Sequence, residues 1–91
     1  MTFEVALTAG AASDLRRLDP AVASRIVRRL RWLAENADSI KPERLTGRWR
    51  GVLKLRVGAY RVLYTRDISE RRLVVHFVRH RRGVYKIGEK G

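Results

Sequence analysis

Three cations alternate with apolar residues in the segment KLRVGAYRVLY, residues 54–64. Lys54 and Arg56 stand two positions apart before Gly58, and Arg61 follows it. Because successive side chains of a strand point to opposite faces, a hairpin over this segment would gather the three cations on one face. Cations fixed in this way bind phosphate and stabilise negative charge that develops on it. The segment therefore predicts an anion site on a hairpin.

A second group of candidate residues lies near the C-terminus, in VRHRRGVY at 78–85. The last predicted strand ends at His80 and brings Arg79, His80, Arg81 and Arg82 to the edge of the sheet, and Tyr85 follows within reach. Guanidinium, ammonium, imidazole and phenol groups without an obligatory metal ligand suit the binding of an RNA strand and of a phosphorane-like transition state. Histidine exchanges protons near neutral pH, so His80 is a candidate for proton transfer.

Each of these residues also has a structural interpretation. Arg56 and Arg61 are possible cross-strand partners for Asp67 or Glu70. A histidine at a strand end often serves structure alone, and the ring of Tyr85 is suited to covering the core. The scarcity of acidic residues nearby favours phosphate contacts for the two arginines.

The elements that must position these residues follow from hydrophobic periodicity. Strand alternation begins at 2–8, and two stretches of helical spacing follow, the second opened by Asp19-Pro20 and running to about Ala37. Strand patterns then return at 52–57, 59–65 and 72–80. We expect an α+β fold of order β-α-α-β-β-β, with a helical hairpin on one face of a small, mostly antiparallel, four-stranded sheet.

The segment 36–51 is predicted to be a linker, since it is rich in polar and turn residues. Leu45 and Trp49 are its expected anchors into the core. Arg48 and Arg50 flank Trp49 and are candidate substrate-binding residues, as are Arg56, Arg79 and Arg82. The tail at 81–91 is short and glycine-rich, which disfavours a helix.

Charge is distributed very unevenly along the chain. Lys and Arg number 21 against 9 Asp and Glu, a formal net charge of +12. Residues 1–43 hold seven basic and six acidic residues, whereas residues 44–91 hold fourteen basic and three acidic residues. A local excess of this kind indicates a polyanionic partner, because Lys and Arg placed on phosphates release counterions. A merely solvated basic face is the alternative.

Length and composition restrict the class of protein to which the chain can belong. The 91 residues form one domain, 1–91. No run approaches the roughly 18 consecutive apolar residues of a membrane span, and Glu4 stands where a signal peptide carries basic residues, so we expect a cytoplasmic protein with no membrane partner. Without cysteine there is no disulfide or thiolate metal site. We expect neither metal nor cofactor.

The segments LTGRWRGVLKLRVGAYRVLY and VRHRRGVY, with DLRRLDP at the start of the helical hairpin, resemble the RelE/ParE superfamily of bacterial toxin–antitoxin toxins over almost the whole chain. RelE-like members cleave mRNA in the ribosomal A site by attack of the ribose 2′-hydroxyl on the adjacent phosphate. ParE-like members share the fold and poison DNA gyrase. The resemblance implies a small toxin that a cognate antitoxin holds inactive in a hetero-oligomer.

The resemblance also implies roles for single residues. Lys54 matches a lysine proposed to act as general base or to stabilise charge, and Arg61 matches the arginine that binds the scissile phosphate. Arg81 matches the arginine placed at the leaving 5′-oxygen, and Tyr85 matches the tyrosine that stacks on the substrate base. Arg56 occupies a family arginine position on the same face.

One position departs from the RelE pattern. Some RelE members carry Lys-x-Lys in this strand, and Val52 stands at the first of these positions. The base function would then rest on Lys54 alone or on His80. Three functions follow from the sequence: an mRNA endonuclease that acts on the ribosome, a ParE-like gyrase inhibitor, and a non-catalytic nucleic-acid-binding module. For the first two we expect an acidic, partly disordered antitoxin that folds on binding.

Overall fold

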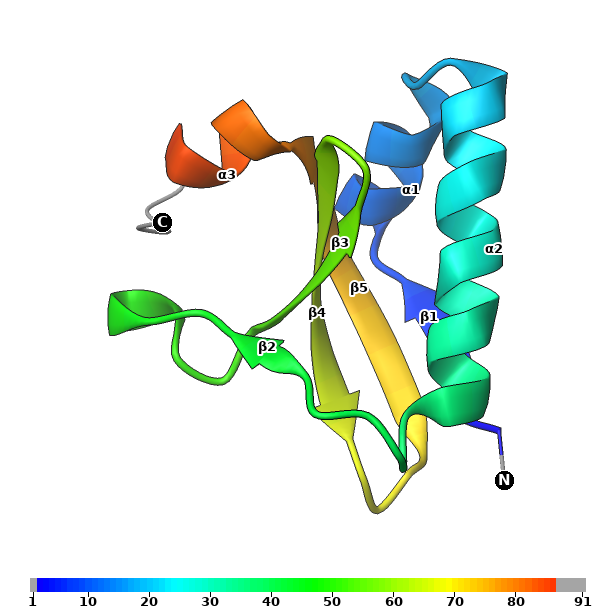
Figure 1. The fold of residues 1–91 in the computed structure, drawn as a ribbon, viewed down its shortest axis with the longest axis vertical. Coiled ribbons are helices and arrows are strands. Elements are labelled where there is room, and N and C mark those ends of the chain that lie inside the picture. Colours follow the sequence, from blue (N-terminus) through cyan, green and yellow to red (C-terminus); the bar gives the residue numbers. More distant parts are fainter. Residues whose placement is uncertain (1, 87–91) are drawn as a thin grey trace.

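The computed structural model of the chain describes residues 2–86, with side chains as far as Gly83. A five-stranded sheet of order β1-β5-β4-β3-β2 has α1 and α2 on one side, as Figure 1 shows. The α+β class, with a helical hairpin on a mostly antiparallel sheet, is therefore confirmed. The elements are β1 (Glu4–Leu7), α1 (Ala9–Arg16), α2 (Pro20–Asn36), β2 (Glu43–Arg44), the 3-10 turn η1 (Gly47–Trp49), β3 (Leu53–Val57), β4 (Tyr60–Asp67), β5 (Arg72–His80) and α3 (Arg81–Lys86).

Side-chain caps begin both helices of the hairpin. The Thr8 hydroxyl accepts a hydrogen bond from the Ala11 N–H of α1 at 3.1 Å. Asp19 accepts one from the Ala21 N–H of α2 at 2.9 Å, and Pro20 occupies the first helical position. Each cap satisfies a backbone donor that the helix leaves unpaired, which fixes where the helix begins.

The strands pair in a register that decides which side chains share a face. β1 runs parallel to β5, whereas β5, β4, β3 and β2 pair antiparallel in turn. The β3–β4 hairpin turns at Gly58, whose φ of 58° favours glycine. A bulge between Leu63 and Tyr64 shifts the pairing of β4 with β5.

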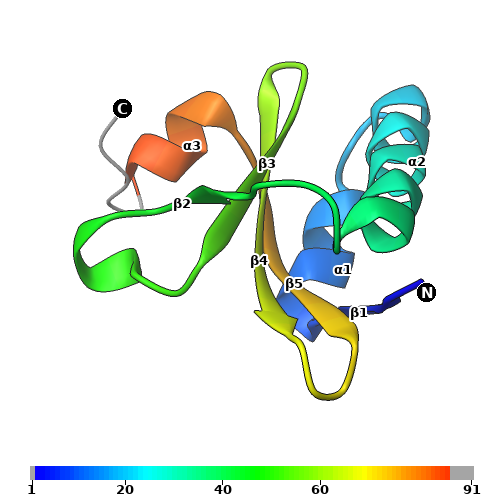
Figure 2. The same ribbon diagram turned by 60° about the horizontal axis from the view of Figure 1, so that its bottom comes forward.

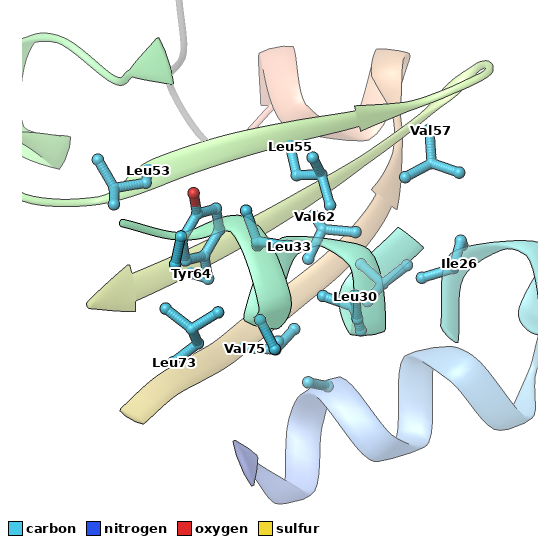
Figure 3. Close-up of a cluster of buried hydrophobic side chains, with 14 of the residues drawn as sticks. Ile26, Leu30, Leu33, Leu53, Leu55, Val57, Val62, Tyr64, Leu73 and Val75 are labelled. Carbon is cyan, nitrogen blue, oxygen red and sulfur yellow. The ribbon is translucent and has the colours of Figure 1, made fainter. Parts of the chain in front are cut away.

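The main core fills the space between the sheet and the two helices (Figure 3). The apolar stripe of α2 packs there on alternate residues of the central strands. Leu53, Leu55 and Val57 of β3 are all buried in this cluster, so the residues between them point to the other side of the sheet. The labelled core residues in Figure 3 are Ile26, Leu30, Leu33, Leu53, Leu55, Val57, Val62, Tyr64, Leu73 and Val75.

Three short elements differ from the sequence prediction. The expected linker contains β2 and η1, so the sheet has five strands rather than four. The expected irregular tail begins with α3. From the sequence, the sheet face that carries Lys54, Arg56 and Arg61 is expected to have no helix over it. Figures 1 and 2 instead show α3 and the η1 segment on the side of the sheet away from α1 and α2. Within residues 2–86, no helix is long and apolar enough to cross a membrane.

Candidate functional site

We call the side of the sheet away from α1 and α2 the far face. Strand register places paired residues of neighbouring strands in rows across this face. Arg56 of β3 pairs with Arg61 of β4, and Arg61 pairs in turn with Arg79 of β5. Adjacent strands lie about 4.8 Å apart, so the three arginine backbones span about 10 Å. The register thus places the backbones of three arginines in one row across the sheet.

Lys54 lies in the next row and is buried, with 7% of its surface exposed. Its register partner on β2 is Glu43, whose carboxylate Oε2 lies 3.8 Å from the Lys54 Nζ. The other carboxylate oxygen of Glu43 lies 3.2 Å from the Nε of Arg56. Glu43 is half-exposed, so one carboxylate joins the two cations and remains accessible to solvent.

Arg61 is held by the hairpin turn. Its guanidinium donates hydrogen bonds to the carbonyl oxygens of Gly58 at 2.9 Å and Tyr60 at 3.0 Å. Two bonds from one nitrogen leave other N–H groups of the fork for a ligand, since a guanidinium carries five donors. The side chain is therefore oriented before any anion arrives.

Arg79 is oriented by α1. Its guanidinium lies 5.1 Å from the centre of the Phe77 ring and forms an ion pair with Asp14. Asp14 is only 8% exposed and also accepts a hydrogen bond from the Val78 N–H at 3.0 Å. β1 pairs with β5 only as far as Val75, so Asp14 satisfies a backbone donor beyond the end of the parallel pair.

The structure does not bring His80 together with Lys54 and Arg61. His80 pairs with Tyr60, which packs against the main core, and the two rings meet edge to face with centroids 5.5 Å apart. The imidazole therefore lies on the α1 side of the sheet. Its Nδ1 accepts a hydrogen bond from the Arg82 N–H at 3.3 Å, in the manner of a helix N-cap at the start of α3.

Arg81 and Arg82 begin α3 and are both exposed. The Arg81 backbone N–H donates to the Ala59 carbonyl at 2.8 Å, which ties the start of α3 to the β3–β4 turn. Tyr85 belongs to α3, but its side chain lies outside the described part of the structure.

A second, smaller apolar group covers part of the far face. Leu63 is fully buried yet stands outside the main core cluster, and its register partner is Phe77. The Trp49 ring from the η1 segment packs edge-on against Phe77, with centroids 6.0 Å apart. Trp49 therefore anchors its segment to the far face rather than to the main core. Arg48 and Arg50 flank it as exposed cations.

A groove of about 230 Å³ joins the Lys54 pair to α2. Glu43, Lys54 and Arg56 line one part of it. Trp32 of α2 lines another part; it is 38% exposed, and the Arg29 guanidinium lies 4.3 Å above its ring centre. Tyr64 also reaches the groove, and its burial raises the pKa of its hydroxyl above the ordinary value. The groove combines cations, one carboxylate and an aromatic surface.

Two acidic residues complete the site and were absent from the sequence prediction. The sequence prediction places Glu43 in the linker, and the two residues of β2, Glu43 and Arg44, are too few to show a strand period. Asp14 has no role in the sequence prediction beyond its place in the segment DLRRLDP, and only the tertiary structure brings it to β5. Together the far-face residues can bind a phosphodiester, neutralise charge developing on it, and accept a proton at one carboxylate.

Solved structures of similar fold come from toxin–antitoxin systems. A chain of the RelBE2 complex from Mycobacterium tuberculosis is 26% identical, with 88% of this chain and 92% of that chain covered and a TM-score of 0.80. The YoeB/ParE toxin from Agrobacterium tumefaciens is 24% identical, with 85% and 96% covered and a TM-score of 0.70. The isolated RelE toxin of E. coli is 18% identical, with 93% and 98% covered and a TM-score of 0.72. These likenesses place the fold in the class of small RelE/ParE-type toxins.

Residues 5–85 match the family model described as the ParE toxin of type II toxin–antitoxin systems, parDE. The chain belongs to this toxin family, so the expected membership of the RelE/ParE superfamily is confirmed. No curated protein matches the chain.

Proposed function

We propose that the chain is a ribosome-dependent endoribonuclease toxin that cleaves mRNA in the A site and thereby inhibits translation. The arginine row from Arg56 through Arg61 to Arg79, with Lys54 and Glu43 beside it, carries this proposal. Such a row costs stability through like-charge repulsion, and a bound phosphodiester would offset that cost.

The reaction is an internal phosphoryl transfer. The ribose 2′-oxygen forms a bond to the adjacent phosphorus while the bond from phosphorus to the 5′-oxygen breaks. The products are a 2′,3′-cyclic phosphate and a 5′-hydroxyl end. The proton of the 2′-hydroxyl passes to a base, and the leaving 5′-oxygen receives a proton from an acid, so the step consumes no further reactant.

The cations of the far face fit the charge that this step develops. Arg61 and Arg56 are proposed to bind the equatorial oxygens of the phosphate, because hydrogen bonds already orient the first and an ion pair the second. Arg81, exposed at the start of α3, is proposed to serve the leaving 5′-oxygen. Tyr85 is proposed to stack on the base. Arg79, Arg82, Arg48 and Arg50 remain proposed contacts to flanking phosphates.

Glu43 is the proposed proton acceptor. Its carboxylate lies within 3.8 Å of the Lys54 Nζ and is half-exposed, whereas Lys54 is buried and cationic. A protonated lysine cannot accept a proton, but it can hold the carboxylate in place and stabilise the forming charge. His80 lies on the α1 side of the sheet and has no part in the proposed proton transfer. The described residues on the far face include no matching neutral acid, which favours help from the ribosome in positioning the substrate.

A cognate antitoxin is the proposed protein partner. Similar chains have been solved in toxin–antitoxin complexes, including the RelE–RelB complex of Pyrococcus horikoshii. The net charge of +12 favours an acidic partner that covers the far face and so excludes RNA.

Inhibition of DNA gyrase is the second candidate function. It is favoured by the family model, which is that of the ParE toxin, and by Val52 at the position of the first lysine of Lys-x-Lys. On this alternative the cationic face binds without performing chemistry.

The test is a reconstituted translation reaction in which mRNA 5′ ends are mapped by primer extension, with and without ribosomes. The endonuclease proposal predicts new ends within the reading frame that need ribosomes and disappear with Arg81→Ala. Arg28→Ala, an exposed arginine on α2, is the matched control and should cleave like wild type. Intact mRNA together with inhibition in a parallel gyrase supercoiling assay would replace the proposal by the second candidate.

A further inference from the structure

The α1–α2 turn and the tip of the β3–β4 hairpin lie at the same end of the molecule (Figure 1). A second cationic pocket lies at this end, lined by residues from the end of α1, from β4 and from β5. It has a volume of about 350 Å³, and the side chains that matter for its chemistry are Arg17, Arg79, His80 and Tyr60. None of these four lines the groove beside Glu43 and Lys54. The pocket is therefore separate from the proposed centre of chemistry, on the α1 side of the sheet.

The inner part of the pocket is fixed by contacts already described. Asp14 is 8% exposed, and its carboxylate is occupied by the Arg79 guanidinium and by the Val78 N–H. The His80 ring is held edge-on against Tyr60, and its Nδ1 accepts the Arg82 N–H. These bonds leave the Nε2 of His80 as the ring nitrogen that can bond a ligand.

The balance of charge in the pocket is positive. Arg17, Arg79 and His80 face a single carboxylate, and Arg79 is 36% exposed even while paired with it. Arg17 is exposed at the C-cap of α1. Among the described lining residues, Asp14 is the one acid, so an entering anion meets little repulsion.

Cations also connect this pocket to the far face. Arg79 belongs both to the pocket and to the arginine row. At the tip of the hairpin, Arg61 donates to the Gly58 carbonyl, and a guanidinium nitrogen of Arg25 from α2 lies 3.5 Å from where a Cβ on Gly58 would stand. The cationic surface therefore continues from the far face, over the hairpin tip, to the α1 side.

We propose that this pocket is a phosphate subsite that binds a backbone phosphate of the RNA strand outside the nucleotides at the scissile bond. That the bound polymer is RNA rests on the proposed function. RNA is favoured over an acidic peptide because Arg79 and the hairpin tip make the pocket continuous with the proposed phosphate row, and one strand presents phosphates to both. The donors are Arg17, the Nε2 of His80 and the exposed part of Arg79.

The experiment compares Arg17→Gln with Arg16→Gln. Both residues are exposed arginines at the end of α1, but only Arg17 lines the pocket. The probe is a fully 2′-O-methylated single-stranded RNA, which cannot be cleaved by 2′-hydroxyl attack, and its affinity is measured by fluorescence anisotropy over a range of salt concentrations. For Arg17→Gln we expect the slope of log affinity against log salt to decrease by about 0.7, the value for one phosphate contact on a single strand. Arg16→Gln should keep the wild-type slope.

A titration of inorganic phosphate into the wild-type protein, followed by two-dimensional NMR of backbone amides, supplies a second measurement that needs no variant. The expected result is a saturable shift at Leu18, Val78, Arg79 and His80. Equal salt slopes for the two variants, or loss of affinity for the antitoxin with unchanged affinity for RNA in Arg17→Gln, would overturn the subsite. A wild type that binds RNA through Arg17 but never cleaves mRNA would refute the proposed function and leave the subsite supported.

Discussion

Arg56 of β3 and Arg61 of β4 stand directly opposite each other in the hairpin register, although both carry a positive charge. Like charges opposite each other in a sheet destabilise it by a few tenths to about 1 kcal/mol. Each side chain is compensated separately, Arg56 by Glu43 and Arg61 by two turn carbonyls. The arrangement favours binding of an anion over stability of the hairpin.

Arg61→Ala should therefore separate function from stability. Loss of one phosphate donor is expected to lower the cleavage rate by about 10²- to 10³-fold. The free energy of unfolding should change by less than about 1 kcal/mol, because relief of repulsion offsets the two lost hydrogen bonds. Single-turnover cleavage and urea unfolding measure the two effects. A large loss of stability with unchanged cleavage would show that Arg61 serves the hairpin alone.

Glu43→Gln tests the proposed proton acceptor. The amide keeps the shape of the side chain but cannot take the proton, so the cleavage rate should decrease by about 10²- to 10⁴-fold while RNA affinity stays the same or rises. Glu35→Gln, an exposed acid on α2, is the matched control. Wild-type rates in Glu43→Gln would mean that Glu43 only neutralises its neighbours.

Asp14→Ala should destabilise the fold more than Asp19→Ala. The first change leaves the Val78 N–H and the half-buried Arg79 without their partner, at an expected cost of about 2–4 kcal/mol. The second removes an exposed N-cap worth about 1 kcal/mol. Chemical denaturation of the two variants gives the order. Equal losses would contradict the structural role given to Asp14.

Stability in alkali should depend on Tyr64. Burial raises the pKa of its hydroxyl, so the folded state favours the neutral phenol. The stability linked to this group is present below the unfolded pKa of about 10 and is lost as the pH rises through the higher folded value. Tyr64→Phe should lose less stability than wild type between pH 9 and pH 11, as measured by urea unfolding. Parallel curves for the two proteins would exclude the effect.

The parts of the fold that periodicity predicts are those with several turns or several alternations. The stripe from Ile26 to Leu33 predicts α2, and the alternation around Gly58 predicts the β3–β4 hairpin and the shared face of Lys54, Arg56 and Arg61. β2 has two residues and α3 has six, with Gly83 inside it, so neither carries a detectable period. Both depend on tertiary contacts, such as the Arg81 N–H bond to Ala59.

The candidate site was predictable only where a single hairpin forms it. Strand alternation alone separates Arg79 from His80, and pairing with Tyr60 places the imidazole on the α1 side. Glu43 lies 11 residues before its partner Lys54 along the chain, and Asp14 lies 65 residues before its partner Arg79. No local sequence pattern predicts such contacts between distant residues.

Attack by the 2′-hydroxyl is tested most directly with mRNA that carries a single 2′-deoxynucleotide at the mapped cleavage position. We expect that the wild-type protein, in the reconstituted translation reaction, no longer cleaves at that position, while unmodified mRNA yields a 5′-hydroxyl end there. Undiminished cleavage of the deoxy-substituted mRNA, or a 5′-phosphate on the product, would show that the 2′-hydroxyl is not the nucleophile and would contradict the mechanism assigned to the far face.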